Sequence, residues 1–525
     1  MGRGDRGRRL RRKRAGGRPR RKEAPRPRLR EGAAMIAPAV RPKLEVLSSA
    51  LVASIVDEAF ALLDRNGVFV ENENALALFR DAGQRVDDAS QRVRLSETLV
   101  REALASTPSE IRLSGRAGAS EFLVGADNVH FNPGSAAVTI LDPGSPLHRK
   151  PTGRDLVRLA RLTESLPNIH FQSTALIAGD VPGDIADSYR LFLALQFSSK
   201  PVVTGTFRVE SFKPMLEMLA AVQGGSAALA AKPPAIFDAC PSPPLKWSRL
   251  TSQSLIDAAR AGLPSELISM GMTGATSPAT ITGTLVQHTA ENLCGLTLCQ
   301  LTRNGAPVIF GGSPSSFDMR KGTTPMGAVE TMMIDVAYAQ IGKSLGLPTH
   351  AYMGLSDAKV IDAQAGFEAA LGAVLAALAG INVVSGPGML NFESTQSLEK
   401  LAIDDEICGM AYRLIAGVSQ RDDPMALPFF EALSASSQFL SLPHTKAWYR
   451  KEHSLARLVD RDTYEDWLAA GRRTIADRAA ADVERRLSAA PPAALDPRLR
   501  EELERIMAAE ARAAGLDRLP EVSDT

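Results

Sequence analysis

The sequence reads PVIFGG at residues 307–312, THAYMG at 349–354 and INVVSGPG at 381–388, and these three apolar runs decide the fold. Each run ends in glycine or another small residue, and polar residues and then a helical pattern follow it. This alternation is typical of repeated βα units. Parallel sheets and barrels place their ligands after the carboxyl ends of the strands. We therefore predict an α/β fold whose site lies just after these runs.

Five earlier runs have the same character and bring the expected strands to eight. The expected strands are Val129–Phe131, Ile169–Leu176, Pro201–Thr206, Ala235–Ala239, Glu266–Met270, Pro307–Phe310, His350–Met353 and Ile381–Val384. Helical segments follow them near Asp155–Leu166, Asp184–Phe197, Glu210–Val222, Ser252–Ala261, Thr280–Leu301, Ala328–Leu345, Ala363–Ala379 and Thr395–Ile415. Eight β-then-α units over about 290 residues match a closed (β/α)8 TIM barrel in number and size. An open doubly wound sheet is the alternative, although no GxGxxG turn or GxxxxGK[ST] loop marks a nucleotide site.

Three further segments surround the predicted barrel. We expect a disordered basic tail at residues 1–40, an N-terminal helical region with a small β element at 41–127, the barrel at 128–417 and a C-terminal helical extension at 418–525. In the second segment we expect helices at Ser48–Asp64, Asn74–Ala82 and Ser90–Ala105, and strands at Ile111–Ser114 and Glu121–Val124.

The net charge of +2 hides an asymmetry between the head and the rest of the chain. Residues 1–32 carry fifteen Lys or Arg against three acids, so the remainder holds 46 basic and 56 acidic residues. Such a head is too polar to fold and lacks the apolar core of a secretory signal. It is either a solvated tail or a contact for nucleic acid or an acidic partner. Met35 offers an alternative start.

Cysteine usage and hydropathy bound the cellular location. The four cysteines have no paired-ligand spacing, which indicates free thiols in a reducing compartment. No apolar run reaches the roughly 18 residues that a membrane span requires. We therefore expect a cytoplasmic protein that has neither a membrane nor a nucleic acid as its partner.

The residues at the predicted strand ends are small and poor in charge. They include Thr204-Gly205-Thr206, Gly311-Gly312-Ser313, Met353-Gly354 and Ser385-Gly386-Pro387-Gly388. Glycine also serves tight βα turns, but so many in one ring predict a wide mouth lined by backbone and hydroxyl groups. Such a mouth suits a bulky group arriving from above better than a phosphate, for which a Lys or Arg would be expected.

Charged and aromatic side chains cluster after the sixth and seventh predicted strands and near the eighth. The charged residues are Asp318, Arg320, Lys321, Glu330, Asp357, Lys359 and Asp362, and the aromatic residues are Phe317, Tyr352 and Phe392. Turns, helix caps and solvated loops also account for charged residues of this kind. Aromatic faces attract a quaternary ammonium, although isolated aromatic residues are more often part of a core.

Metal chemistry is not expected from the sequence. His288, Cys294 and Cys299 share one predicted helix, in which His288 and Cys299 are about 16 Å apart along the axis. Bonds of about 2 Å cannot join both side chains to one zinc ion. No GxSxG elbow supports a Ser-His-Asp nucleophile.

Four long motifs resemble the trimethylamine methyltransferase family. They are FDMRKGTTPMGAVE (317–330), GLSDAKVIDAQAG (354–366), LAGINVVSGPGML (378–390) and GMTGATSPATITGTLVQHTAE (271–291). The resemblance covers most of the chain after about residue 45 and leaves out the basic head. It implies a TIM barrel that moves a methyl group from a methylated amine to the Co(I) of a corrinoid. The resemblance further implies that a separate corrinoid protein presents this cob(I)alamin at the barrel mouth, so that no cofactor is bound tightly.

Leu355 occupies the position at which the founding members of that family hold pyrrolysine, immediately before SDAK. Leucine cannot form the proposed pyrrolysine–amine adduct, so the chain resembles the non-pyrrolysine branch. Characterised members of that branch demethylate quaternary amines such as glycine betaine, proline betaine and carnitine. A quaternary ammonium already carries its charge, and cob(I)alamin is itself a strong nucleophile. The protein then needs only to bind, orient and exclude water, which would explain the lack of an obvious general base.

The resemblance suggests positions for the site, to which we assign roles as hypotheses. Phe317, Tyr352 and Phe392 are candidate walls of an aromatic cage, and Gln364 completes the substrate-binding set. Asp318, Glu330 and Asp357 are candidates for electrostatic attraction, and Lys359 or Arg320 for holding a betaine carboxylate. Together with Leu355, the residues Asp318, Glu330, Asp357 and Lys359 form the predicted catalytic set.

Two rival functions stay open at the level of sequence. One is a barrel lyase or aldolase in which Lys359 forms a Schiff base with a carbonyl substrate. The other is a quaternary-amine sensor that kept the cage and lost turnover, in which the basic head contacts DNA. By resemblance to the family, we also expect the chain to form a homo-oligomer.

Overall fold

The computed structural model describes residues 39–118, 120–431, 434, 438–489 and 494–520. Nearly all of the predicted basic tail therefore lies outside the described residues. The chain forms two compact units. The larger one comprises residues 41–417 and 454–525, and the smaller one comprises residues 418–453 together with the chain up to residue 40.

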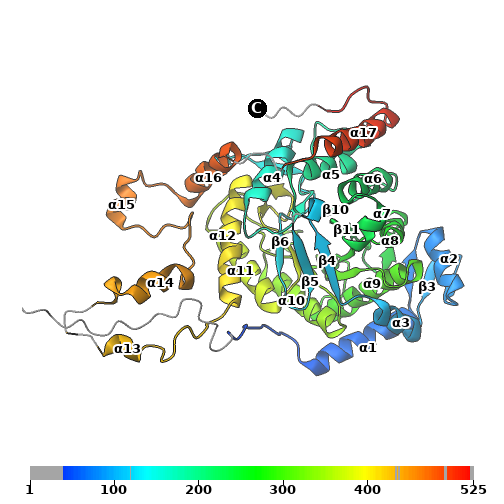
Figure 1. Ribbon diagram of the computed structural model, residues 1–525. Coiled ribbons are helices and arrows are strands. Elements are labelled where there is room, and N and C mark those ends of the chain that lie inside the picture. Colours follow the sequence, from blue (N-terminus) through cyan, green and yellow to red (C-terminus); the bar gives the residue numbers. More distant parts are fainter. Residues whose placement is uncertain (1–38, 119, 432–433, 435–437, 490–493, 521–525) are drawn as a thin grey trace, which may run out of the picture. The chain divides into compact units, whose positions relative to one another are not determined.

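Eight short parallel strands form the centre of the larger unit (Figure 1). They are β6 (His130–Asn132), β9 (Gln172–Ser173), β10 (Val202–Gly205), β11 (Ala235–Ala239), β13 (Ser265–Ser269), β15 (Val308–Gly312), β17 (His350–Tyr352) and β18 (Val383–Ser385). Each lies at a predicted strand position. Apolar runs mark them so clearly because such strands are buried on both faces.

Backbone pairing closes these strands into a ring. Parallel ladders join β9 to β10, β11, β13 and β15 in that order, and β17 to β18 and β6. Single parallel bridges complete the ring, Phe131 with Ile169 between β6 and β9, and Phe310 with Thr349 between β15 and β17. The predicted (β/α)8 barrel is therefore confirmed, and the open doubly wound sheet is excluded.

One long helix follows each barrel strand, and the helices surround the strands in chain order (Figure 1). They are α4 (Gly153–Ser165), α5 (Ala186–Phe197), α6 (Phe212–Gln223), α8 (Arg249–Ala261), α9 (Ile281–Thr302), α10 (Val329–Ser344), α11 (Ala363–Ala379) and α12 (Leu398–Ile415). Side chains of Ser248, Thr280, Asp362 and Ser397 accept hydrogen bonds at the N-termini of α8, α9, α11 and α12. Such N-caps satisfy backbone donors that a helix leaves free and so fix where each helix begins.

Short elements decorate the connections of the barrel. They are β7 (Thr139–Leu141), β8 (His148–Arg149), α7 (Ser226–Ala231), β12 (Lys246–Trp247), β14 (Met272–Thr273), β16 (Ser315–Ser316), β19 (Met389–Leu390) and β20 (Thr395–Gln396). β19, β20, β7 and β8 form one small sheet, and β14 pairs with β16. Most of these elements follow a barrel strand, so they shape the end of the barrel where the carboxyl ends of the strands lie.

The N-terminal region packs mainly against α9 on the side of the barrel, and its last hairpin reaches the opposite end of the barrel. It contains α1 (Ser49–Arg65), β1 (Val68–Val70), α2 (Glu73–Asp81), β2 (Arg85–Asp87), β3 (Arg92–Arg94), α3 (Glu97–Ser106), β4 (Glu110–Ser114), a 3-10 turn at Arg116–Gly118 and β5 (Glu121–Gly125). The β4–β5 hairpin packs Ile111, Leu113 and Val124 against apolar residues of four barrel strands and against Phe171, which precedes β9. These buried side chains plug the barrel floor, so a ligand has to enter from the other end.

The predicted helix at Ser90–Ala105 is wrong in its first turns. Arg92–Arg94 form strand β3, in which Val93 is buried between two more exposed arginines. Helix α3 begins only at Glu97, where Ser96 accepts a hydrogen bond from the Leu99 amide. The alternation in RVR therefore describes a half-buried strand, and pairing with β1 and β2 fixes it.

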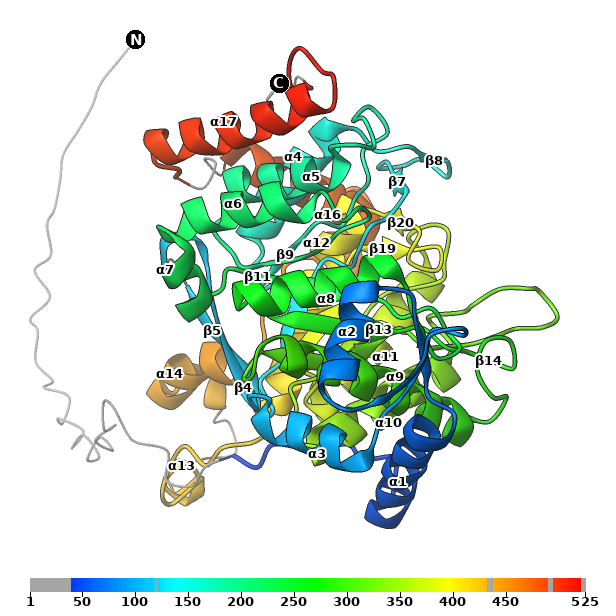
Figure 2. The same cartoon turned by 90° about the vertical axis from the view of Figure 1, so that its right-hand side faces the viewer.

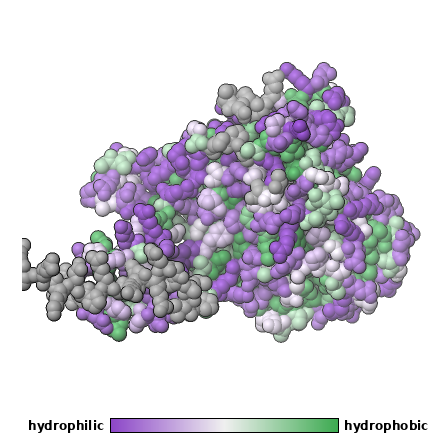
Figure 3. Space-filling view, viewed as in Figure 1, coloured by the Kyte–Doolittle hydropathy of each residue, from purple (hydrophilic) through white to green (hydrophobic). Residues whose placement is uncertain are grey.

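Two C-terminal helices pack against the outside of the barrel. α16 (Ile475–Ala489) contacts α4 and α12, and α17 (Pro497–Ala513) contacts α5 and α6 (Figure 2). The short helix α15 (Tyr464–Ala469) precedes them. Most residues visible on the barrel body are hydrophilic (Figure 3), as expected where apolar side chains are used inside. None of the helices in the described part of the chain is long and apolar enough to span a bilayer.

The smaller unit contains α13 (Leu427–Phe430), a 3-10 turn at Phe439–Ser441 and α14 (Pro443–Glu452). Ion pairs within it join Arg421 to Glu452 at 2.5 Å and His444 to Asp422 at 2.9 Å. These contacts connect the chain after the barrel to α14.

Helix α11 offers a matched test of the packing at the barrel mouth. A Cβ atom at Gly372 would lie 2.7 Å from the backbone nitrogen of Gly354, whereas one at Gly366 would meet nothing within 4 Å. We expect Gly372→Ala to lower the free energy of unfolding by about 1–3 kcal/mol, because the crowded atom is backbone. Gly366→Ala should raise it by about 0.5–1 kcal/mol through helix propensity. Urea unfolding of both variants tests this, and equal effects would contradict the close approach of α11 to Gly354.

Candidate active site

Strand register shows which side chains point into the barrel. Val203, Ile236, Ile309 and Val383 lie in the apolar plug and therefore face inward. Asp238 is two residues beyond Ile236, and Glu266 pairs with both Asp238 and Ile309. His350 pairs with Val383. Since side chains alternate along a strand and paired residues share a face, Asp238, Glu266 and His350 all point into the barrel.

The inward-facing residues change from apolar to polar toward the mouth. Tyr352 and Ser385 pair with each other, two residues beyond His350 and Val383, and Ser385 also pairs with Asn132. Asn132 Nδ2 donates to Ser385 Oγ at 2.8 Å. The barrel therefore has an apolar floor and a polar middle layer, which is the arrangement of a site closed from below and open above.

Glu266 is the most unusual residue of this layer. Its side chain is completely buried, and neither carboxylate oxygen has a hydrogen-bond partner. His350 Nε2 lies 3.0 Å from Glu266 Oε1 and 3.0 Å from Ser385 Oγ, but only the contact with Ser385 has hydrogen-bond geometry. Burial lowers the pKa of His350 to about 3, although Asp238 opposes this shift, so the imidazole is neutral. The histidine therefore provides no positive charge for Glu266.

Three buried carboxyl groups belong to this region, and we call them the interior acid cluster: Asp238 and Glu266, which pair on neighbouring strands, and Glu393, which Asp238 influences electrostatically. Burial raises the pKa of each well above its ordinary value, and Glu266 and Glu393 are each electrostatically coupled to Asp238. The same three carboxyl groups also raise the pKa of Tyr352, again after burial as the main cause. Asp238 and Glu393 are half-buried as whole residues, although Asp238 Oδ1 and Glu393 Oε1 are buried.

Glu393 joins the cluster from a loop rather than from a strand. Asn391, Phe392 and Glu393 have φ angles of +52°, +57° and +65°, three successive left-handed residues without a glycine. Each such residue costs on the order of 1–2 kcal/mol. Glu393 Oε1 is buried and has no hydrogen-bond partner. Backbone strain in the loop and desolvation of this carboxyl group both lower the stability of the fold.

Four of the residues singled out by sequence lie together on the surface. Phe317, Asp318, Arg320 and Glu330 line a pocket of about 430 Å³ next to β16 and α10. Arg320 is 87% exposed and pairs with Asp318 at 2.8 Å, which lowers the pKa of Asp318 to about 2. Asp318 and Arg320 thus neutralise each other outside the barrel. Their predicted roles stay predictions.

Asp357 and Gln364 lie in a second group that anchors the mouth loops. Asp357 accepts hydrogen bonds from the backbone amides of Met326 and Gly327, both at 2.9 Å. Burial raises the pKa of Asp357 to about 6, although these two amides oppose the shift. Gln364 Nε2 donates to Glu368 Oε1 at 2.9 Å. These contacts join the motif after β17 to the motif before α10.

Glu368 extends this hydrogen-bond network to the residues that follow Leu355. It accepts hydrogen bonds from the hydroxyl of Ser356 at 2.6 Å and from the amide of Asp357 at 2.9 Å. Leu355 itself is buried in the apolar core. The side chain at the pyrrolysine position therefore serves packing, and polar partners hold the residues around it.

Lys359 occupies the face of one predicted cage residue. Its ammonium group lies 3.8 Å from the centre of the Phe392 ring, and it also donates to the carbonyl of Asp357 at 2.6 Å. Tyr352 is the one predicted aromatic that lies inside the barrel, where its ring meets His350 edge-on at 4.8 Å. The structure thus places Tyr352 with the interior acid cluster and Lys359 with Phe392.

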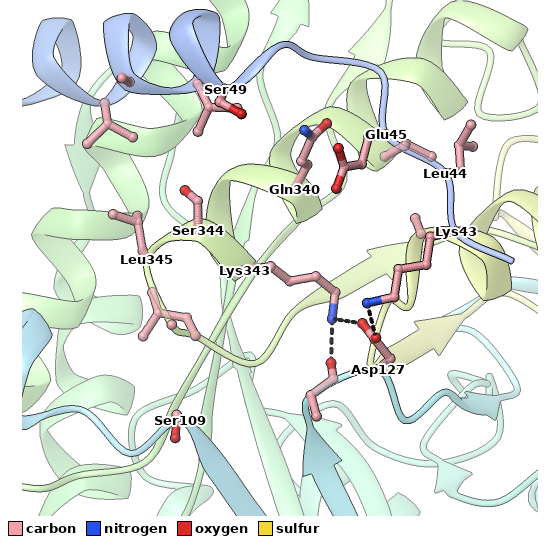
Figure 4. Close-up of a pocket in the computed structure, with 18 of the residues that line it drawn as sticks. Lys43, Leu44, Glu45, Ser49, Ser109, Asp127, Gln340, Lys343, Ser344 and Leu345 are labelled. Carbon is pink, nitrogen blue, oxygen red and sulfur yellow. Dashed lines mark hydrogen bonds and ion pairs between the residues drawn. The ribbon is translucent and has the colours of Figure 1, made fainter. Parts of the chain in front are cut away.

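A larger pocket of about 830 Å³ lies at the other end of the barrel (Figure 4). Lys43 and Lys343 both point toward Asp127 in it, at 2.6 and 3.4 Å. Its lining includes residues that precede β6, β17 and β18, so it lies at the amino ends of the strands. Barrel enzymes place their chemistry at the carboxyl ends, and we therefore locate the active site in the interior acid cluster.

The charged residues of the barrel interior lie one layer below the small strand ends that the sequence predicted. The terminal residues are indeed small, but Asp238 and Glu266 lie within the strands IFDA and SELIS. A carboxylate inside a strand that is buried on both faces is costly unless it has a function. The sequence itself therefore contains this signal, as an acid inside each of two apolar runs. Among the described residues, no group of three or more His, Cys, Asp or Glu could hold a metal ion.

Comparison with known proteins gives the family. The model of the trimethylamine methyltransferase (MTTB) family matches residues 12–515. The chain is 34% identical over 418 residues to trimethylamine methyltransferase MttB of Desulfitobacterium hafniense strain DSM 10664 / DCB-2, covering 80% of this chain and 84% of that protein. It is 31% identical over 477 residues to the glycine betaine methyltransferase of D. hafniense strain Y51, covering 90% and 98%.

A solved structure is also similar, the hydroxylamine complex of MtmB, with 13% identity and a TM-score of 0.47 over 83% of this chain and 93% of that one. The barrel assignment itself rests on the strand pairings.

The chain is therefore a barrel protein of a methyltransferase class, with an acidic interior site. It belongs to the trimethylamine methyltransferase family, as the sequence motifs predicted. The family match starts at residue 12, so the expectation that the whole basic head lies outside it is wrong.

The buried carboxyl group of Glu266 predicts how the stability of the fold depends on pH. An acid whose pKa is raised in the folded state binds more protons there than in the unfolded state. Stability is therefore lost as pH rises above the unfolded pKa of about 4.5, by about 1.4 kcal/mol per pH unit until the folded pKa is reached. We expect Glu266→Gln to remove much of this loss and to be more stable than the native chain at pH 8, with a smaller difference at pH 5.

Urea unfolding at the two pH values, without any amine, measures this difference. Glu58→Gln, which changes an exposed glutamate of α1, is the control and should change stability little at either pH. A Glu266→Gln variant that is less stable than the native chain at pH 8 would contradict the buried, unpartnered state of this carboxyl group.

Proposed function

We propose that this chain transfers a methyl group from a quaternary methylated amine, such as glycine betaine, to the Co(I) corrinoid of a partner corrinoid protein. The observation that carries the proposal is Glu266, which is completely buried, has no hydrogen-bond partner and points into the barrel, where it pairs with Asp238 and contacts His350. A site with three carboxyl groups, one aromatic ring and a neutral histidine suits a cation.

The chemistry of a quaternary ammonium matches what the site contains. Such a cation makes no N–H hydrogen bonds, so it needs surrounding negative charge and an aromatic face rather than directed acceptors. Losing a methyl group turns it into a neutral amine, which requires no proton at that moment. The corrinoid is the second substrate and supplies the nucleophile. The barrel residues have to bind the amine, orient one methyl group toward the mouth and exclude water.

Two further observations support a quaternary rather than a tertiary amine. The similarity to the glycine betaine methyltransferase extends over 98% of that protein. Leu355 is an apolar side chain packed in the core, and it has no group with which to capture an amine covalently. A cytoplasmic location and a homo-oligomeric state remain predictions.

The first experiment follows methyl transfer directly. Purified protein is mixed with free cob(I)alamin, and the conversion to methylcobalamin is followed by its spectrum with glycine betaine, proline betaine, carnitine, choline and trimethylamine in turn. We expect conversion with at least one quaternary amine and none with trimethylamine. Conversion with trimethylamine alone would overturn the assignment to quaternary amines. Tight binding of an amine without conversion, even with a corrinoid protein present, would favour the sensor.

The same assay tests the interior acid cluster. We expect Glu266→Gln and Asp238→Asn to lower kcat/KM for the active quaternary amine by about tenfold or more, which is about 1.4 kcal/mol of lost stabilisation. Asp257→Asn is the matched control, since Asp257 is a half-buried carboxyl group of α8 whose pKa is also raised by burial. It should keep native activity. Unchanged kcat/KM in both cluster variants would place the substrate elsewhere.

A further inference from the structure

We propose that the substrate cation enters the interior acid cluster in exchange for a proton, so that binding releases about one proton to solvent. This inference rests on the proposed function, because it assumes that an amine cation binds inside the barrel. It goes beyond that function by stating the charge state of the empty site and how it changes on binding.

The first argument is the lack of a free countercharge. The titratable and charged groups around the cluster are Cys240 beyond β11, His350 and Tyr352 of β17, Asp335 and Tyr338 of α10, and Arg190 of α5. Arg190 is the one cation in this set, and it pairs with Asp187 at 3.2 Å. Asp335 adds a further buried carboxyl group whose two oxygens have no hydrogen-bond partner.

The second argument is electrostatic. Two like charges at about 4 Å repel by about 4 kcal/mol even at an effective dielectric constant of 20. Carboxyl groups that share a buried site therefore cannot all ionise, and at least one keeps its proton. Burial raises the pKa of all three carboxyl groups, the charge of Glu266 raises the pKa of Asp238 further, and the charge of Asp238 raises that of Glu393. The empty site thus holds protons at neutral pH.

A bound quaternary ammonium, whose charge does not depend on pH, stabilises an ionised carboxyl group in the cluster. When a quaternary ammonium enters, one carboxyl O–H bond breaks, its electron pair stays on the carboxylate and the proton leaves to water. The cluster then carries one more negative charge than before, next to the positive charge of the cation. After the methyl group has left, the amine is neutral, and the carboxylate takes a proton back from water. Atoms and charges balance over the cycle without any further reactant.

Glu393 is the most suitable exchanging group. It is the cluster member that a loop presents, and the residue as a whole is only half-buried, although its Oε1 atom is buried. Glu266 is completely buried and lies deeper, next to His350. We therefore assign the exchange to Glu393 and the permanent charge environment to Glu266 and Asp238.

Isothermal titration calorimetry of the full chain tests the exchange. Glycine betaine and choline are titrated at pH 7 in two buffers of different ionisation enthalpy, such as phosphate and Tris. The difference in observed enthalpy gives the number of protons released, which we expect to be about one. By the same linkage, Kd should fall about tenfold for each unit of rising pH while the exchanging group is protonated. Glu393→Gln should abolish both effects.

Two controls make the outcomes separable. The neutral carbon isostere of choline, 3,3-dimethylbutan-1-ol, should bind at least tenfold more weakly and release no proton. Asp257→Asn should release the native number of protons. Binding of a quaternary amine with no proton release and a pH-independent Kd would overturn the exchange and leave the proposed function standing. Failure of every amine to bind would instead overturn the proposed function.

Discussion

The burial of Glu266 without a hydrogen-bond partner is the constraint on which the functional reading of this structure depends. A carboxyl group in this state costs several kcal/mol in an apolar interior, and the barrel stabilises it with neither a cation nor a donor. The closed ring and the apolar plug remove water from below. A ligand that brings positive charge from above would relieve the cost. The buried carboxyl group therefore lowers the stability of the fold while the site is empty, and a bound cation would restore it.

The long motifs that reveal the family connect two loops at the barrel mouth. Asp357 holds the amides of Met326 and Gly327, and Glu368 holds Ser356 and the amide of Asp357. The two segments come from different βα units, and these bonds lock them together at the mouth. Hydrogen bonds to charged groups contribute about 1.5–3 kcal/mol each, so the loops that any incoming partner meets are held rigid. Residues of these motifs position the loops of the barrel mouth, and the interior acid cluster, which suits a cation, lies below them.

The sequence predicts the barrel because its strands are apolar runs. The same pattern does not distinguish the residues of the site, because they lie inside these runs. Asp238 and Glu266 lie within the apolar runs IFDA and SELIS, which predict strands but not the direction of their side chains. Only the strand register shows that both point into the barrel. Tyr352 is recognisable from sequence because it is an aromatic residue next to the small residues at the end of its run. Glu393 could not have been placed, since three successive left-handed residues turn it inward and no local pattern predicts such backbone. The pairing of Arg320 with Asp318 likewise depends on a turn geometry that the sequence does not reveal.

The charge state of the interior also bears on which amines the site distinguishes. A protonated tertiary amine brings a cation and a removable proton, so inside a cluster of carboxyl groups it can lose that proton and its charge. A quaternary ammonium keeps its charge whatever its surroundings, and only the protein can respond. In such a site the fixed charge is held by Coulomb attraction that persists after entry, whereas the tertiary amine loses this attraction when the proton moves. Discrimination then follows from the chemistry of the nitrogen rather than from the size of the pocket, which agrees with the apolar side chain of Leu355 where a covalent capture group would otherwise lie.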